Sequence, residues 1–92
     1  MWHLYIIRCA DSSLYTGITN DIMRRIKIHN SRKGGSYTRS RAPVDLVYHE
    51  ACEGKSEALK RECQIKKWTR NKKLALIRGD LSQLIEVSKS RD

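Results

Sequence analysis

The chain of 92 residues can form one domain, and too little sequence is left over to close a second hydrophobic core. Hydrophobic residues make up 39% of the chain and phenylalanine is absent, so the core is expected to be small and built from Leu, Ile, Val, Trp and Tyr. Lys and Arg number 19 against 10 Asp and Glu, which gives a formal net charge of +9 at pH 7.

The positive charge is concentrated, because residues 22–73 hold 15 Lys and Arg and only 5 Asp and Glu. A surface with charge of one sign favours a polyanion as partner, since each phosphate that it neutralises releases condensed counterions. The alternative is a solvated basic surface that only aids solubility. Charge alone does not separate DNA, RNA and acidic lipid.

The cysteines and the apolar segments exclude several classes of protein. Cys9, Cys52 and Cys63 are too far apart for the paired ligands of a zinc site, so reduced thiols are expected. The first residues lack the basic start and the apolar run of a signal peptide, and no segment approaches the ~20 apolar residues of a membrane span. We therefore expect a soluble, cytoplasmic protein that does not associate with a membrane.

The first half of the chain predicts a hairpin followed by a helix. Residues 2–8 and 14–18 are rich in β-forming residues, and turn-forming residues at 9–13 separate them. Thr19, Asn20 and Asp21 can cap a helix, which is predicted over about residues 21–29.

The second half predicts a loop over residues 31–43, a third strand over 45–51, a long helix over 57–68 and a short helix from 71 to Gly79. Residues 80–92 are expected to form a short C-terminal helix and a frayed tail, so the domain is predicted to span residues 1–79. The order β-β-α-β-α-α indicates an α/β fold with a small, mainly antiparallel sheet flanked by helices.

The first predicted helix carries polar residues where apolar ones are expected. Ile22, Arg25, Ile26 and His29 follow the spacing of a helix face that packs on a core, yet two of the four are Arg and His. Alternatively, the helix is rotated so that Met23 and Ile26 point inward. Arg25 would then lie at the rim, and His29 would be a hydrogen-bonded histidine at the rim.

The long helix shows a similar break in its pattern at Glu62, which shares a face with Ala58 and Ile65. Glu57 precedes Arg61 at a spacing that favours a surface ion pair, so Glu57 is assigned a structural role. A buried, unpaired carboxylate costs several kcal/mol and persists where a metal, an arginine or a substrate offsets that cost. The alternative for Glu62 is a salt bridge to one of the nearby basic residues.

The predicted hairpin contributes Tyr5 and Tyr15, which by themselves indicate only packing. Gly17, two residues after Tyr15, is more informative, because a glycine within a strand often marks the close approach of another group.

The residues that these patterns single out suit phosphodiester hydrolysis. A carboxylate can hold a divalent cation, an arginine can stabilise charge on a phosphate, and a phenol or imidazole can orient or deprotonate water. A neutral tyrosine, with a pKa near 10, needs a nearby cation to act as a base. The candidate catalytic residues are Tyr5, Tyr15, Gly17, Arg25, His29 and Glu62.

At these residues the chain resembles the GIY-YIG nuclease superfamily. The two naming triplets appear as Leu4-Tyr5-Ile6 and Tyr15-Thr16-Gly17, followed by residues 25–29 and by Glu62 in the family's order and spacing. The stretch 37–48 resembles a branch of small, stand-alone, functionally uncharacterised bacterial proteins. That branch is similar to the catalytic domain of structure-selective nucleases that cut branched DNA. The resemblance covers about residues 1–79.

The resemblance implies a GIY-YIG endonuclease fold with a three-stranded antiparallel sheet, and a metal-dependent DNA endonuclease of repair or recombination. One Mg²⁺ or Mn²⁺ ion would be held chiefly by Glu62, and Arg25 would take the arginine role. Tyr5 or Tyr15 would help to activate water, and His29 occupies a position where the superfamily has His or Tyr. A non-catalytic DNA- or RNA-binding module on the same fold is the alternative function.

DNA, in branched or flapped form, is the partner that the resemblance implies. Relatives commonly rely on a separate DNA-recognition domain, so substrate choice would come from the fold itself or from a protein partner. The predicted nucleic-acid-binding residues are Arg24, Lys27, Arg32, Lys33, Tyr37, Arg39, Arg41 and Lys66.

Overall fold

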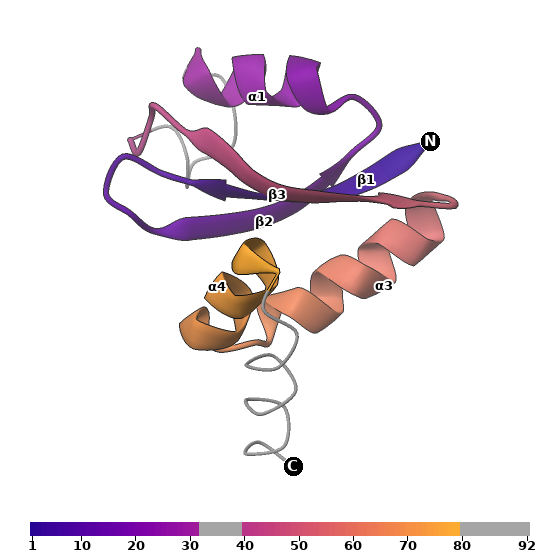
Figure 1. The fold of residues 1–92 in the computed structure, drawn as a ribbon. Helices are drawn as coiled ribbons and strands as arrows, with labels where there is room; N and C mark the ends of the chain where they lie inside the picture. The colour runs from indigo at the N-terminus through magenta and orange to yellow at the C-terminus, as the bar shows by residue number, and fades with distance from the viewer. Residues whose placement is uncertain (32–39, 80–92) are drawn as a thin grey trace.

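The sheet has three antiparallel strands in the order β2-β1-β3, so the first strand lies in the middle (Figure 1). This arrangement comes from a computed structural model that describes residues 1–31 and 40–79. Strand β1 spans Trp2–Arg8, β2 spans Leu14–Thr19 and β3 spans Asp45–Cys52. The predicted antiparallel sheet and the order β-β-α-β-α-α are confirmed.

Strand β1 is covered on both of its faces. Its run Leu4–Ile7 is at most 1% exposed, which fits a central strand without the alternation of polar residues that a half-exposed strand shows. Tyr5 pairs with Gly17 of β2 on one side and with His49 of β3 on the other. Because side chains alternate along a strand, Tyr5 faces one layer of helices while Leu4 faces the other.

Helix α1 (Ile22–Asn30) covers one face of the sheet, and helices α3 (Lys55–Lys66) and α4 (Arg70–Arg78) cover the other (Figure 1). The predicted caps are present: the Asp21 side chain accepts a hydrogen bond from the Arg24 amide, and Gly79 ends α4 in the left-handed conformation. Helix α3 begins two residues earlier than predicted, because Gly54 takes the capping position, and it also ends two residues earlier, with Lys67 as its C-cap.

Each layer has its own apolar cluster. The cluster on the α1 side consists of Tyr5, Ile7, Cys9 and Val44, with Tyr15 and Ile26 packed against it. The cluster on the other side consists of Leu4, Ile6 and Ile65, and among its neighbours are Leu14, Tyr48, Trp68, Leu76 and Ile77. The Tyr5 side chain thus belongs to the α1 side.

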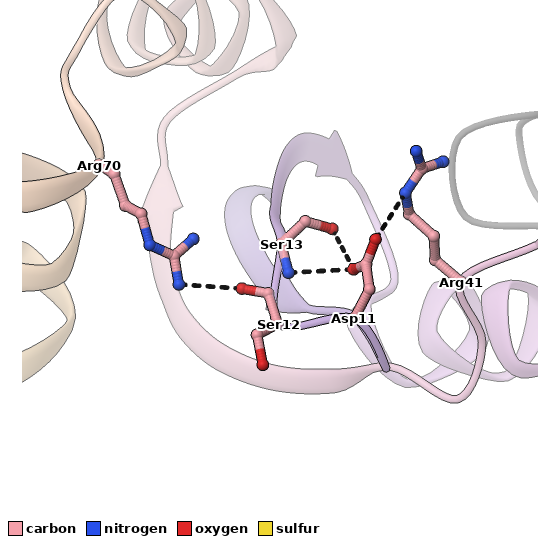
Figure 2. A network of polar contacts seen from close by, with 5 residues as sticks. All are labelled: Asp11, Ser12, Ser13, Arg41 and Arg70. Carbon is pink, nitrogen blue, oxygen red and sulfur yellow. Dashed lines mark hydrogen bonds and ion pairs between the residues drawn. The ribbon is translucent and has the colours of Figure 1, made fainter.

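The β1–β2 turn is held from both sides by arginines (Figure 2). Asp11 accepts hydrogen bonds from the amide and hydroxyl of Ser13, and Arg41 donates from Nε to Asp11 Oδ2 over 3.0 Å. Arg70, the first residue of α4, donates to the carbonyl oxygen of Ser12 over 3.0 Å. These bonds fix the hairpin relative to α4 and to the segment that leads into β3.

The cysteines are free thiols, as expected. Among the described helices, none combines the length and the apolarity that crossing a membrane requires. The C-terminal segment 80–92 and most of the predicted loop, residues 32–39, lie outside the described residues, so the predictions for them stay predictions.

Candidate active site

The Tyr5 hydroxyl is the centre of the candidate site. It lies directly above Gly17: a β-carbon added to Gly17 would stand 2.6 Å from Tyr5 Oη and 2.8 Å from its Cζ. Only glycine leaves room for the ring at that point of β2. The close approach predicted from the glycine is confirmed, and the group that approaches is the other tyrosine of the hairpin.

His29 of α1 is fully buried, and its Nε2 lies 3.0 Å from Tyr5 Oη. Arg25 lies one helical turn before His29 and donates a long hydrogen bond from Nε to Tyr5 Oη over 3.4 Å. A guanidinium has only donors, so the tyrosine oxygen is the acceptor in that contact. This leaves the hydroxyl proton of Tyr5 to be donated to an unprotonated Nε2 of His29.

The environment moves the two titrating groups in opposite directions. Burial lowers the pKa of His29 from its ordinary value of 6.5, and the charge of Arg25 lowers it further. Burial raises the pKa of Tyr5 above 10.0, although the hydrogen bond and charge of Arg25 act against that rise. At pH 7 both groups are therefore neutral.

The stripe predicted for α1 is correct, and the rotated alternative is wrong. Met23 is 73% exposed, whereas His29 is buried and Arg25 is half-buried. His29 is therefore not at the rim. Tyr15 completes the aromatic part of the site, with its ring centroid 5.6 Å from that of His29 and 6.5 Å from that of Tyr5.

Arg25 connects Tyr5 with a hollow at the start of α1. The hollow has a volume of about 200 Å³, and Arg24 lines it together with Arg25. It gives the guanidinium access to a ligand outside the core. The complete lining consists of Thr19, Asn20, Asp21, Arg24, Arg25 and Ile28.

Glu62 comes from the other layer, on α3, which lies against β2 and β1 (Figure 1). Its side chain is 19% exposed, and Oε2 lies 3.4 Å from Nζ of Lys66 one turn later. The salt bridge that the sequence left open as an alternative is thus present. The charge of Glu62 also contributes, after burial and Tyr15, to raising the pKa of the Tyr5 hydroxyl.

The ion pair expected between Glu57 and Arg61 is wrong. Arg61 instead donates from Nε to Glu50 of β3 over 2.7 Å, and Glu57 lies 3.8 Å from Lys60. Arg61 therefore pairs with a glutamate of strand β3 and not with the glutamate of its own helix. Spacing along the sequence does not show this pairing.

The basic residues of the site divide into several groups. Arg24 and Lys27 are exposed on α1, Lys66 pairs with Glu62, and Arg41 is bound to Asp11. Arg32, Lys33, Tyr37 and Arg39 lie outside the described residues.

The sequence did not single out Lys73 of α4, whose pKa is lowered by burial and then by the charge of Lys66. No helical spacing links Lys66 to Lys73, because a helix break separates them.

The side chains of the candidate site can be compared with the ligands that a divalent metal ion prefers. Within residues 1–31 and 40–79, no three His, Cys, Asp or Glu side chains come together as a metal cluster. Glu62 would therefore offer one hard oxygen ligand. That fits Mg²⁺, which keeps several of its waters and is bound by one or two carboxylates together with substrate phosphates.

Comparison with known proteins shows the family to which the chain belongs. Residues 1–75 match the model of the GIY-YIG catalytic domain, a domain of a nuclease-type superfamily. The chain is 57% identical over 77 residues to UPF0213 protein CPE1444 of Clostridium perfringens, covering 84% of this chain and 83% of that protein. It is 52% identical over 71 residues to a UPF0213 protein of Bacillus pumilus, covering 77% and 72% of the two chains.

Two solved structures are also similar. The solution NMR structure of UPF0213 protein BH0048 from Bacillus halodurans has a TM-score of 0.56 at 44% identity, covering 87% of this chain and 86% of that one. The solution NMR structure of protein EF2693 from E. faecalis has a TM-score of 0.57 at 38% identity, covering 84% and 82%. The chain therefore belongs to the GIY-YIG domain family, within its small stand-alone UPF0213 proteins.

Proposed function

We propose that this protein is a metal-dependent DNA endonuclease that hydrolyses phosphodiester bonds. The observation that carries the proposal is the Tyr5 hydroxyl, which contacts a neutral imidazole at 3.0 Å and a guanidinium at 3.4 Å. A hydroxyl between a proton acceptor and a cation can handle the proton of an attacking water. Packing alone would require one hydrogen-bond partner for the buried hydroxyl, which His29 supplies, but it would not require a cation as well.

The pKa values indicate how Tyr5 and His29 share the proton. Their ordinary values of 10.0 and 6.5 already make a tyrosinate–imidazolium pair unfavourable by about 5 kcal/mol, and burial shifts both groups further apart. A standing tyrosinate is therefore not the base. In the proposed step, Tyr5 Oη takes a proton from water while its own proton passes to Nε2 of His29. The tyrosine stays neutral, the water oxygen attacks phosphorus, and the bond from phosphorus to the leaving sugar oxygen breaks as that oxygen takes a proton from a solvent water. His29 afterwards releases its added proton to solvent.

Arg25 and Glu62 complete the proposed chemistry. Arg25, at the hollow before α1, is placed to stabilise negative charge that develops on the phosphate. Glu62 would hold a Mg²⁺ or Mn²⁺ ion, which when bound supplies Lewis-acid stabilisation of the phosphate oxygens. Tyr5 is preferred over Tyr15 for the proton step, because Tyr5 contacts both the imidazole and the guanidinium.

The family resemblance extends the proposal further. On that ground we propose that the substrate is branched or flapped DNA, that the protein acts in repair or recombination, and that a protein partner adds specificity. The free thiols agree with a reducing, cytoplasmic compartment.

A second candidate function is a non-catalytic nucleic-acid-binding module. The ion pair between Glu62 and Lys66 favours it, because that pair gives the carboxylate a structural reason to be present.

Cleavage of labelled duplex, flap and four-way-junction DNA with Mg²⁺ or Mn²⁺ separates the two functions. Glu62→Ala is compared with Glu57→Ala, an exposed glutamate on the same helix that also pairs with a lysine. The nuclease proposal expects nicking that Glu62→Ala abolishes and Glu57→Ala retains, with DNA binding intact in both. Binding by the wild type without cleavage of any substrate would support the binding module.

A further inference from the structure

The Asn30 side chain ties the end of helix α1 to the segment before β3. Asn30 is the last residue of α1, and its Oδ1 accepts a hydrogen bond from the Val44 amide over 2.6 Å. Its Nδ2 donates a second hydrogen bond to the Val44 carbonyl oxygen over 3.3 Å. A side-chain amide carries both a donor and an acceptor, so it pairs with one residue of an extended segment as a neighbouring strand would. Val44 is only 3% exposed, and Asn30 satisfies both of its backbone polar groups.

Val44 is a fixed point for this contact. Its side chain belongs to the apolar cluster that also contains Tyr5. The start of the same segment is held by the β1–β2 turn, because the Ala10 amide donates to the carbonyl oxygen of Arg41 over 2.8 Å. The Arg41 side chain donates in turn to Asp11 (Figure 2). The amide contact therefore joins the end of α1 to a part of the chain that other contacts already hold in place.

The residue that this contact would steady is His29, the neighbour of Asn30 in α1. Its Nε2 lies 3.0 Å from the Tyr5 hydroxyl. The end of a helix frays unless it is tied down, because the last carbonyl groups have no partner within the helix. We propose that Asn30 is a positioning residue, which keeps the His29 imidazole within reach of the Tyr5 hydroxyl by holding the end of α1 against the segment before β3.

The consequence for the reaction rests on the proposed function, because only there does the contact between Tyr5 and His29 carry a proton. The hold on the imidazole is a property of the fold and does not require cleavage. The position of the imidazole and the rate of nicking are therefore measured separately, each in Asn30→Ala and in a control.

Ser31→Ala is the matched control. Ser31 is the C-cap of α1, and its hydroxyl donates to the carbonyl oxygen of Ile28 over 2.8 Å. This variant also loses a hydrogen bond at the end of α1, but the lost bond stays within the helix and does not reach Val44. Asn30 and Ser31 are both exposed, so water can replace either side chain and both variants should fold. Urea unfolding of each variant checks this.

NMR spectra of the protein without DNA or metal measure the position of the imidazole. At about pH 8 His29 is neutral, because its pKa lies below the ordinary 6.5. The rings of Tyr5 and His29 have centroids 6.0 Å apart, which allows NOEs between their edges. Asn30→Ala should weaken these NOEs and shift the ¹⁵N resonance of Nε2 toward that of an imidazole without a hydrogen bond, whereas Ser31→Ala should keep both signals. Equal NOEs in the two variants, whether retained or lost, would overturn the proposal.

Single-turnover nicking with saturating enzyme and Mg²⁺ or Mn²⁺ tests the consequence for the reaction. Asn30→Ala should lower the rate about 10-fold with unchanged DNA binding, because a displaced imidazole takes the proton less readily, and Ser31→Ala should stay within about 2-fold. In a Tyr5→Phe background, which has no proton to pass on, Asn30→Ala should lower the rate less than about 2-fold. An equal loss in both backgrounds would show that Asn30 does not act through the contact between Tyr5 and His29.

The NMR measurement keeps the two proposals apart, because it does not depend on cleavage. If the NOEs between Tyr5 and His29 depend on Asn30 but the wild type nicks no substrate, the hold on His29 stands and the nuclease proposal fails. If nicking depends on Glu62 but the NOEs are the same in Asn30→Ala and Ser31→Ala, the nuclease proposal stands and the positioning role of Asn30 fails.

Discussion

The hydroxyl of Tyr5 lies 3.0 Å from Nε2 of His29, although 24 residues separate them in the chain. Tyr5 lies on the central strand and His29 on the helix that covers one face of the sheet. Both residues are buried, and each gives the other a polar partner in that layer. The contact therefore has a structural value, satisfying two buried polar groups, besides its proposed catalytic value.

Gly17→Ala should damage both stability and activity. The new methyl group would stand 2.6 Å from Tyr5 Oη, so the buried ring must move, at a cost of about 1–3 kcal/mol. Cleavage should fall at least about 100-fold, because the hydroxyl leaves its place. Gly54→Ala is the control, since a methyl group there meets nothing within 4 Å. Urea unfolding and nicking assays check the pair, and equal behaviour of both variants would contradict the account.

His29 should make stability depend on pH. Its pKa in the folded protein is below the ordinary 6.5, so the unfolded chain binds more protons between the two values. The stabilisation is complete above pH 6.5 and should be lost as the pH falls from 6.5 through the lowered pKa of the folded state. Melting temperatures from pH 5 to 8 should show this loss in the wild type and a flatter profile in His29→Gln. Parallel profiles for the two proteins would exclude His29 as the cause.

Thr16→Val should stabilise the protein by about 1 kcal/mol. Thr16 is 4% exposed, and its Oγ1 has no hydrogen-bond partner among the described residues. Burying an unpaired hydroxyl is costly, and valine has nearly the same shape without it. Thr19→Val should do the opposite, because Thr19 Oγ1 donates to the carbonyl and accepts from the amide of Asp21. Chemical denaturation gives the free energy of unfolding of both variants. A destabilised Thr16→Val would show that the Thr16 hydroxyl forms a hydrogen bond.

Arg25→Ala should lower the cleavage rate about 100- to 1000-fold while DNA binding changes little, because the lost charge acts on the phosphate during reaction. Arg24→Ala provides the comparison. Arg24 lines the same hollow but is exposed, so its loss should weaken DNA binding more than it slows the bound reaction. Single-turnover rates and binding constants separate the two effects. Similar losses of cleavage rate in both variants would contradict a specific role of Arg25 in stabilising charge on the phosphate.

Local sequence signals predicted the elements well. The β-forming run at residues 2–8 gave the limits of β1, Asp21 marked the start of α1, and Gly79 marked the end of α4. These features depend on neighbouring residues, as caps and strand propensity do. Gly17 also predicted a close approach, because a residue without a side chain weakens a strand unless another group fills the space above it.

Tertiary contacts could not be predicted in the same way. The sequence did not show that Tyr5 rather than Tyr15 meets His29 through its hydroxyl, because strand order and the direction of α1 decide it. Spacing paired Arg61 with Glu57, but the fold brings Glu50 closer. Lys73 was overlooked for the same reason, since its partial burial, which lowers its pKa, depends on the fold and not on spacing along the chain.

The single-turnover rate of DNA nicking by Tyr5→Phe tests the central claim most directly, because the change removes one oxygen atom and keeps the buried ring. Tyr48→Phe is the control, since Tyr48 packs on the other face of the sheet. With Mg²⁺ or Mn²⁺ and saturating enzyme, we predict that Tyr5→Phe loses at least about 100-fold in rate with unchanged DNA binding, while Tyr48→Phe stays near the wild type. A Tyr5→Phe rate within about threefold of the wild type would contradict the proposed proton transfer through Tyr5 and His29.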